Sequence, residues 1–387
     1  MKISDVIEKE FPIARKVIYL NTAGVGLIPK SVVGSISSFY MRTLTVPPYE
    51  ELFHEYAKLV EGARGEFGRL ISASRDEVAF QANTSASTNS VVQMLRWRKG
   101  DNAVFDDLGF PSDTYPLIAL SRKGIEARMA RSKDGFVSPD EYERLVDKRT
   151  KLVMLSLVSW INGMRSDVES VARIAKEKGA LVMVDSTHGT GYVDINVKRW
   201  RVDFLATSNY KWLLSPFGTS EFYCAREHLE EFDPPQVGWH SVRRESKTLD
   251  VAKFEHAKNA KRFEAGNPDY VSIFGLIQSL RFLSKVGHSV VRSRTLKLAG
   301  QAIEGLDELG FKISTPREEE RRSAIVFASL EGMDGVKLAG YFRKKGIWVT
   351  ARRYGRLSGI RLSPYFYTSE DDVQEFLNAA SEIARRT

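Results

Sequence analysis

A strand–helix–strand pattern between residues 151 and 184 most constrains what this chain can fold into. The apolar runs Lys151–Leu155 and Leu181–Val184 lack polar alternation, which is typical of strands buried on both faces. Between them, Val168–Lys178 carries apolar residues at helical spacing, and Gly179 follows as a residue that ends a helix. We therefore predict a βαβ unit, and with it a parallel sheet covered by helices.

The chain divides into two regions of different texture near residue 285. Before it, strand patterns alternate with helical ones, and the further strands expected there are Val78–Gln81, Ala103–Phe105, Phe204–Ala206 and Glu221–Cys224. After it, the elements expected are Val290–Leu309, Phe311–Ile313, Ala324–Ser329, Met333–Lys345, Ile347–Thr350, Gly359–Leu362 and Glu370–Arg386. We predict an α/β fold with a large domain over residues 17–285 and a smaller α+β domain formed by residues 1–16 and 286–387.

Composition narrows the class of protein. The chain has 387 residues and a formal charge of +8, but its basic residues are spread along the sequence, which does not favour nucleic acid as a partner. The one cysteine, Cys224, lies in an expected strand, and the six histidines lack metal-ligand spacing. The N-terminus is charged, and no apolar run approaches the ~18 residues of a membrane span. We therefore expect a cytoplasmic protein with no metal and no membrane or nucleic-acid partner.

Residues that follow the strands are the candidates for chemistry, because ligands of an open parallel sheet bind beyond the carboxyl ends of its strands. Thr84 and Ser85 follow one strand and open a helix, where hydroxyls and free amides form an anion site; simple N-capping is the alternative. Phe110 follows another strand and either stacks on a flat ligand or joins the core.

Charged residues follow two further strands. Asp185 ends an apolar strand, where a carboxylate is costly to bury without a cation such as a protonated pyridine nitrogen; a turn aspartate is the alternative. Lys211 lies between apolar residues and a Pro/Gly turn, and a desolvated amine with a lowered pKa suits Schiff-base chemistry. His188 could reach a ring oxygen or serve only structurally, and Ser208 and Tyr210 could add hydroxyls to a phosphate site.

In this combination the residues resemble the class V aminotransferase family of pyridoxal-phosphate (PLP) enzymes, which also includes cysteine desulfurases and isopenicillin-N-epimerase-like proteins. The resemblance covers nearly the whole chain, with motif segments at residues 19–24, 83–85, 110–112, 185–188, 208–212, 262–268 and 361–364. It implies the aspartate-aminotransferase-like fold, PLP fold type I, and pyridoxal 5'-phosphate as the cofactor.

The resemblance also implies roles for single residues. Lys211 would hold the cofactor as a Schiff base and move the substrate α-proton, Asp185 would pair with the pyridine nitrogen, and His188 would contact the phenolic oxygen. The remaining cofactor-binding residues would be Phe110, which stacks on the ring, and the phosphate-binding Thr84, Ser85, Ser208 and Tyr210. Asn267 would reach the phosphate of a partner subunit, which implies a homodimer with the site at the subunit interface. The substrate-binding residues would be Arg361, which takes the substrate carboxylate, Asn21 and Ala23.

The segment Thr350–Gly355, which we expect to be a loop, bears on the reaction. It contains no cysteine, whereas a desulfurase needs a nucleophilic thiol there, so we exclude a cysteine desulfurase. Its Arg352 and Arg353 either recognise a second carboxylate or belong to a solvated basic loop.

A single lysine base suffices for transamination, so we predict a PLP-dependent aminotransferase acting on a small amino acid and a 2-oxo acid. An epimerase or lyase is the alternative; epimerisation needs a proton donor on the opposite face, for which Tyr354, His240 or a water is available. A non-enzymatic protein on the same fold is a more distant alternative, and intact Lys211 and Asp185 speak against it.

Overall fold

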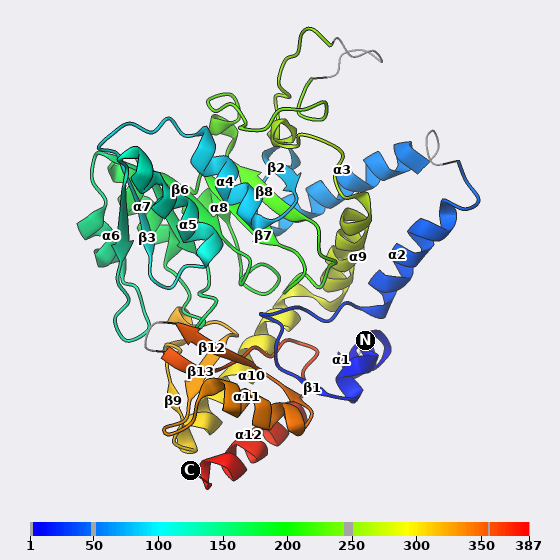
Figure 1. Cartoon of the computed structure of the whole chain (residues 1–387). Helices are drawn as coiled ribbons and strands as arrows, with labels where there is room; N and C mark the ends of the chain where they lie inside the picture. The colour runs from blue at the N-terminus through cyan, green and yellow to red at the C-terminus, as the bar shows by residue number, and fades with distance from the viewer. Residues whose placement is uncertain (1–2, 48–51, 244–250, 355–356, 387) are drawn as a thin grey trace.

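A computed structural model describes residues 3–47, 52–243, 251–354 and 357–386 (Figure 1). Its centre is a seven-stranded sheet. The strands, in spatial order, are β2 (Val78–Gln81), β8 (Ser220–Cys224), β7 (Phe204–Ser208), β6 (Leu181–Asp185), β5 (Thr150–Ser156), β3 (Asn102–Asp106) and β4 (Glu126–Ala130). The pairs from β7 to β4 are parallel, whereas β8 runs antiparallel to both of its neighbours.

Helices cover both faces of this sheet, as the unbroken apolar strands predicted. Successive strand residues point to opposite faces. Val153 and Leu155 accordingly lie in one apolar core with the helix α7 (Val168–Glu177), and Leu152 and Met154 lie in another core with α4 (Thr84–Met94) and α5 (Pro111–Ala119). Two shorter helices, α6 (Pro139–Leu145) and α8 (Val197–Trp200), lie on the same face of the sheet as α7.

A second, four-stranded antiparallel sheet lies below the first in Figure 1. Its strands, in spatial order, are β12 (Thr350–Tyr354), β13 (Leu357–Leu362), β10 (Val326–Ser329) and β9 (Lys312–Ile313). The helices that accompany it are α10 (His288–Glu308), α11 (Gly335–Lys344) and α12 (Glu370–Ala384). The short strands β1 (Ile18–Tyr19) and β11 (Ile347–Trp348) pair in parallel and so tie the N-terminal segment to this lower part.

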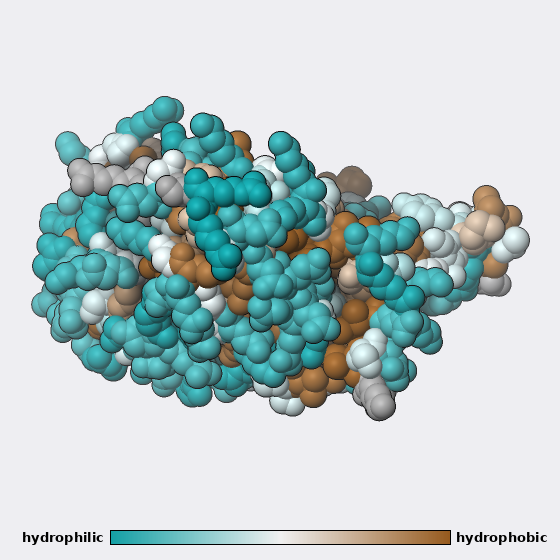
Figure 2. Space-filling model, turned by 90° about the horizontal axis from the view of Figure 1, so that it is seen from below, coloured by the Kyte–Doolittle hydropathy of each residue, from teal (hydrophilic) through white to brown (hydrophobic). Residues whose placement is uncertain are grey.

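The remaining helices are α1 (Ile3–Glu10), α2 (Lys30–Arg42), α3 (Phe53–Leu70) and α9 (Tyr270–Val286). The ends of α2 and α3 project from the body as an arm (Figure 1). Seen from below, the body is largely hydrophilic, while hydrophobic surface lies where the arm leaves it and at the arm's end (Figure 2). Tyr40 and Met41, in the last turn of α2, and Leu44, two residues beyond its end, are all more than half exposed.

The predicted α/β fold, with a mostly parallel sheet and a smaller α+β part, is confirmed. Three details were wrong or missed: β8 is antiparallel, the edge strand β4 was not expected, and the expected loop Thr350–Gly355 is strand β12 as far as Tyr354, with Gly355 outside the described residues. The domain limits stay a prediction, although Phe11 does contact Phe366 of the lower part, with ring centroids 5.8 Å apart. None of the described helices is long and apolar enough to cross a membrane.

Candidate active site

Lys211 lies three residues after β7, in a turn that removes it from water. The residue is 8% exposed, and burial lowers the pKa of its amine to about 8 despite the opposing charge of Asp185. The Tyr210 carbonyl accepts a hydrogen bond from the amide of Gly26 (2.9 Å). A side chain at Gly26 would collide with the Lys211 carbonyl, so glycine is required where these two segments cross. Lys211 is therefore uncharged, and so nucleophilic, in a much larger share of molecules near neutral pH than an ordinary lysine is.

This pKa makes a pH-dependent prediction. In the cofactor-free protein, labelling of Lys211 by an amine-directed reagent should rise with pH through a midpoint of about 8, because only the neutral amine reacts. Exposed lysines, with an ordinary pKa of about 10.4, should reach full labelling only at higher pH. Peptide mass spectrometry across pH 6.5–10.5 separates the sites. A Lys211 curve that coincides with that of the exposed lysines would contradict the prediction.

His188 and Asp185 lie beside this amine at the end of β6. The Nε2 atom of His188 is 3.3 Å from Nζ of Lys211, and burial, together with the Lys211 charge, holds the pKa of His188 well below its usual range. The ring is therefore neutral. Asp185, the last residue of β6, accepts a hydrogen bond from the amide of Thr187 (2.8 Å). This is the hydrogen bond expected of a turn aspartate, the alternative interpretation of Asp185. Because Asp185 also acts electrostatically on Lys211, it belongs to the same site.

A second buried carboxyl, Asp113 on α5, was missed in the sequence. It is 1% exposed and accepts a hydrogen bond from the Ser156 hydroxyl (3.3 Å). Burial and the neighbouring charge of Asp185 raise the pKa of Asp113 well above its usual range. The raised pKa favours the protonated form of Asp113, which can donate a hydrogen bond to Asp185. An acid in a first helical turn normally indicates only a favourable helix dipole, so the sequence carried no distinct signal for it.

A cluster of hydroxyls lies at the N-terminus of α4. The Thr84 hydroxyl is 2.7 Å from that of Ser208 and 3.3 Å from that of Thr187, and Ser85 donates to Ser112 (2.7 Å). The helix cap is another residue, Asn83, whose side chain accepts the amide of Ala86. The capping interpretation of Thr84 and Ser85 is therefore wrong. Hydroxyls converging on a helix N-terminus suit a phosphate.

Phe110 lies over the amine rather than in the core. Nζ of Lys211 is 5.7 Å from the centre of its ring, and the residue is half-buried and outside the described apolar cores. Trp160 packs edge-on against Phe110, with ring centroids 5.3 Å apart. Trp160 was another residue that the sequence did not single out. A flat ring could stack on Phe110 above Lys211.

Arg361, on β13, brings the lower sheet to this site. It is 1% exposed, and its Nη1 donates to the Trp160 carbonyl (2.7 Å). Its Nε and Nη2 have no hydrogen-bond partner within the described residues, and burial lowers its pKa to about 9. Thr350, which pairs with Arg361 across the sheet, donates to Asn21 (2.5 Å). The amide of Ala23 donates to the Ser363 hydroxyl (2.9 Å), so both N-terminal candidates lie next to β13. A buried guanidinium with two unpaired donors is suited to a carboxylate.

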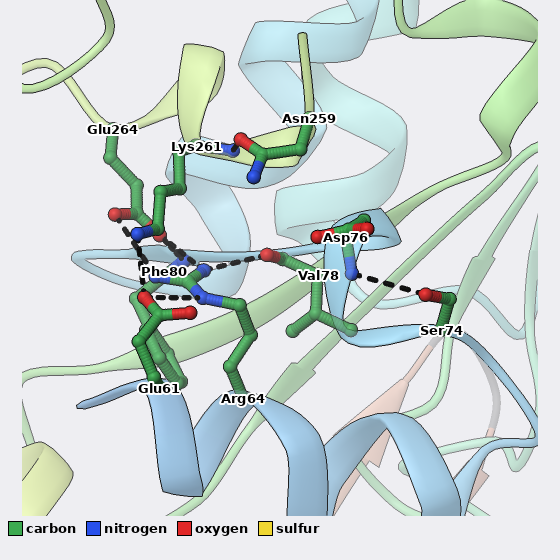
Figure 3. A network of polar contacts seen from close by, with 9 residues as sticks. All are labelled: Glu61, Arg64, Ser74, Asp76, Val78, Phe80, Asn259, Lys261 and Glu264. Atoms are coloured by element: carbon green, nitrogen blue, oxygen red, sulfur yellow. Dashed lines mark hydrogen bonds and ion pairs between the residues drawn. The ribbon is translucent and has the colours of Figure 1, made fainter. Parts of the chain in front are cut away.

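Asn267 and Tyr210 are placed less closely. Asn267 is exposed, and the segment that carries it is anchored three residues earlier by Glu264, which is buried and accepts hydrogen bonds from Arg64 (2.6 Å) and from the amide of Phe80 (2.8 Å) (Figure 3). Tyr210 stacks on Phe217, with ring centroids 4.2 Å apart. Their roles toward a phosphate stay predictions.

One suggested proton donor for epimerisation, His240, is described by the structure. His240 lines a cavity of about 900 Å³ beside Arg64 and Glu264, and Lys211 is not among the residues that line it. The side chain of Tyr354 lies outside what the structure describes.

The comparisons with known proteins agree with this geometry. The family model "Aminotransferase class-V" matches residues 18–376, and the chain belongs to that family. It is 26% identical to a probable cysteine desulfurase of Pyrococcus abyssi, covering 100% of this chain and 98% of that protein. It is 27% identical to isopenicillin N epimerase of Streptomyces clavuligerus, covering 95% of each. The structure of a cysteine desulfurase from Thermococcus onnurineus superposes with a TM-score of 0.92 at 27% identity, covering 100% of this chain and 99% of that one.

The cofactor is pyridoxal 5'-phosphate, as the resemblance predicted. The residues fit it: a buried amine with a lowered pKa, an aromatic ring over that amine, a buried carboxylate, and hydroxyls at a helix N-terminus lie together. His188 Nδ1 also lacks a hydrogen-bond partner within the described chain.

Proposed function

We propose that this protein is a PLP-dependent aminotransferase that acts on a small amino acid and a 2-oxo acid, with the cofactor held on Lys211. One observation carries the proposal: among the described residues, the one buried lysine amine, next to a neutral histidine, lies in the same site as a buried arginine with unpaired donors. A base and a carboxylate-binding group are what an amino-acid half-reaction requires of the protein.

Each group has a distinct task in this proposal. Lys211 would hold the cofactor, Asp185 would face its ring nitrogen, Phe110 would stack on its ring, and Thr84 and Ser208 would bind its phosphate. Bound PLP supplies an electron sink for charge that develops at the substrate α-carbon. Arg361 would orient the substrate through its carboxylate. Nζ of Lys211, once released, is the base that takes up and returns the α-proton, and burial of the site keeps water from competing for it.

We do not propose cysteine desulfurase activity, although several relatives are named for it. Cys224 is the only cysteine of the chain. It lies on β8 with no exposed surface, and burial raises the pKa of its thiol well above the usual range. A protonated, enclosed thiol is a poor nucleophile.

The likeness to isopenicillin N epimerase makes epimerisation the second candidate. The visible spectrum of the purified holoenzyme with single amino acids, added without a 2-oxo acid, distinguishes the two. Bleaching of the cofactor band by one amino acid supports the transaminase and identifies a donor. An unchanged band with a substrate that inverts or breaks down supports the epimerase or a lyase. A protein that takes up no PLP contradicts both.

Arg361 gives a further test. We expect Arg361→Met to lower kcat/KM about 30-fold or more, mainly through KM, because loss of one partner of a buried charge pair costs about 2–5 kcal/mol. Steady-state kinetics with one donor amino acid measure the change. Arg343→Met, an arginine on α11 whose guanidinium lies over Trp348, is the matched control and should leave both parameters unchanged. An unaltered KM in Arg361→Met would remove Arg361 from the substrate site.

We also propose a homodimer and a cytoplasmic location. The exposed position of Asn267 and the exposed apolar residues at the end of α2 support a partner subunit. Sedimentation analysis tests the dimer, and a complementation mixture of inactive Lys211→Ala and Asn267→Ala subunits tests whether the site is shared.

A further inference from the structure

We propose that the site recognises substrates with a second anionic group, and that Arg352 binds it. The substrate class is then an amino acid with an anionic side chain, or the corresponding 2-oxo acid. This inference rests on the function proposed above and specifies its substrate.

Strand pairing places Arg352 beside Arg361. On β12 and β13, Thr350 pairs with Arg361 and Arg352 pairs with Gly359. Side chains alternate along a strand, so Arg352 shares the face of Thr350 and Arg361. Diagonal neighbours of this kind are about 7–8 Å apart at their backbones, within reach of long side chains. Gly359, directly opposite Arg352, adds no side chain between the two guanidinium groups.

Trp160 directs Arg352 toward the cofactor side. The guanidinium carbon of Arg352 lies 5.8 Å from the centre of the Trp160 ring. Trp160 also packs against Phe110, donates from Nε1 to the Gly109 carbonyl, and accepts a hydrogen bond from Arg361 at its own carbonyl. The charge of Arg352 also lowers the pKa values of Lys211 and His188. Its field therefore reaches the reacting amine.

Arg352 and Arg361 both have buried hydrogen-bond donors that an anion could pair with. Nε of Arg352 and Nε and Nη2 of Arg361 are buried without hydrogen-bond partners, and no carboxylate of the described residues forms an ion pair with either arginine. The charge of Arg352 adds to burial in lowering the pKa of Arg361, so the two cations act on each other. Two neighbouring cations are best stabilised by a ligand with two anionic groups.

Arg353 lies on the opposite face of β12 from Arg352. Its guanidinium points to α11, where it pairs with Asp334 (3.1 Å), and its side chain is 74% exposed. Of the two arginines considered in the sequence, only Arg352 faces the site. Arg353 is therefore a matched control on the same strand.

The test is calorimetric binding to the PLP-loaded protein, which does not depend on turnover. The probes are succinate and glutarate, each compared with the monocarboxylate of the same length, butyrate or valerate. We expect at least one dicarboxylate to bind about tenfold more tightly than its monocarboxylate, because a paired carboxylate contributes about 1.4 kcal/mol or more. Arg352→Met should abolish this preference, and Arg353→Met should keep it.

Arg352→Lys, which keeps the charge without the planar fork, is a second variant and should retain part of the preference. Equal binding of both ligand types by the wild type, or a preference that survives in Arg352→Met, overturns the inference. These results are separable from the fate of the proposed function. If an uncharged amino acid bleaches the cofactor and the protein shows no dicarboxylate preference, the transaminase is supported and the second anion-binding group is not. Dicarboxylate preference without bleaching leaves the anion site and removes the transaminase.

Discussion

Lys211→Ala is expected to abolish covalent cofactor attachment while the fold remains intact. Among the described residues, Lys211 is the lysine whose amine is buried, with a pKa lowered to about 8 and His188 beside it, so we expect it to be the point of attachment. We expect the activity to fall about 10²–10⁴-fold, the usual contribution of a positioned proton-transfer group. Borohydride reduction followed by peptide mapping measures the attachment directly.

The exposed Lys178→Ala is the control and should keep both the adduct and the activity. Circular dichroism of Lys211→Ala should match the wild type, because the alanine methyl occupies space within the existing turn. An adduct mapped to another lysine in the wild-type protein would refute the assignment.

Asp185→Ala should be nearly as damaging. Its carboxylate stabilises the charged form of Lys211 and would face the ring nitrogen of the cofactor. Removing one member of a buried charge pair costs about 3–5 kcal/mol, so we expect kcat to fall about 10²–10⁴-fold and cofactor affinity to fall with it. Stopped assays at saturating PLP separate the two effects.

Asp113→Asn tests whether Asp113 acts on Asp185 through a hydrogen bond. In its protonated form, which the raised pKa favours, Asp113 can donate to Asp185, and an asparagine amide of nearly the same size can do so as well. Activity should therefore change by no more than about fivefold, the worth of one ordinary hydrogen bond. Asp113→Leu cannot donate a hydrogen bond, so its activity should lie between those of Asp113→Asn and Asp185→Ala. Equal loss in the asparagine and leucine variants would show that Asp113 acts through its charge.

Residues that end or follow strands were predictable because topology fixes where they go. The carboxyl ends of parallel strands meet at one edge, so Asp185, Ser208 and Lys211 could be placed together from the βαβ pattern. The antiparallel β8 could not be predicted this way, because its apolar run has the same appearance in either direction. The edge strand β4, which mixes charged and apolar residues, did not stand out as a strand.

Contacts made by backbone or between distant segments were beyond the sequence. The Trp160 carbonyl, which holds Arg361, carries no signal in the identity of its side chain. The two arginines of β12 suggested a loop because the strand lies at the edge of its sheet, where charged side chains are common. Only the strand register separates Arg352, on the site face, from Arg353, on the other.

The antiparallel β8 has a consequence for the order of folding. β2 has no partner other than β8 in the large sheet, and the two strands are roughly 140 residues apart in sequence, with Gln81 paired to Ser220. During synthesis, β2 and the helix N-terminus that follows it must wait until β8 has left the ribosome. The hydroxyl cluster at the N-terminus of α4 therefore assembles late, and until then β2 is an open edge that chaperones or other chains can engage.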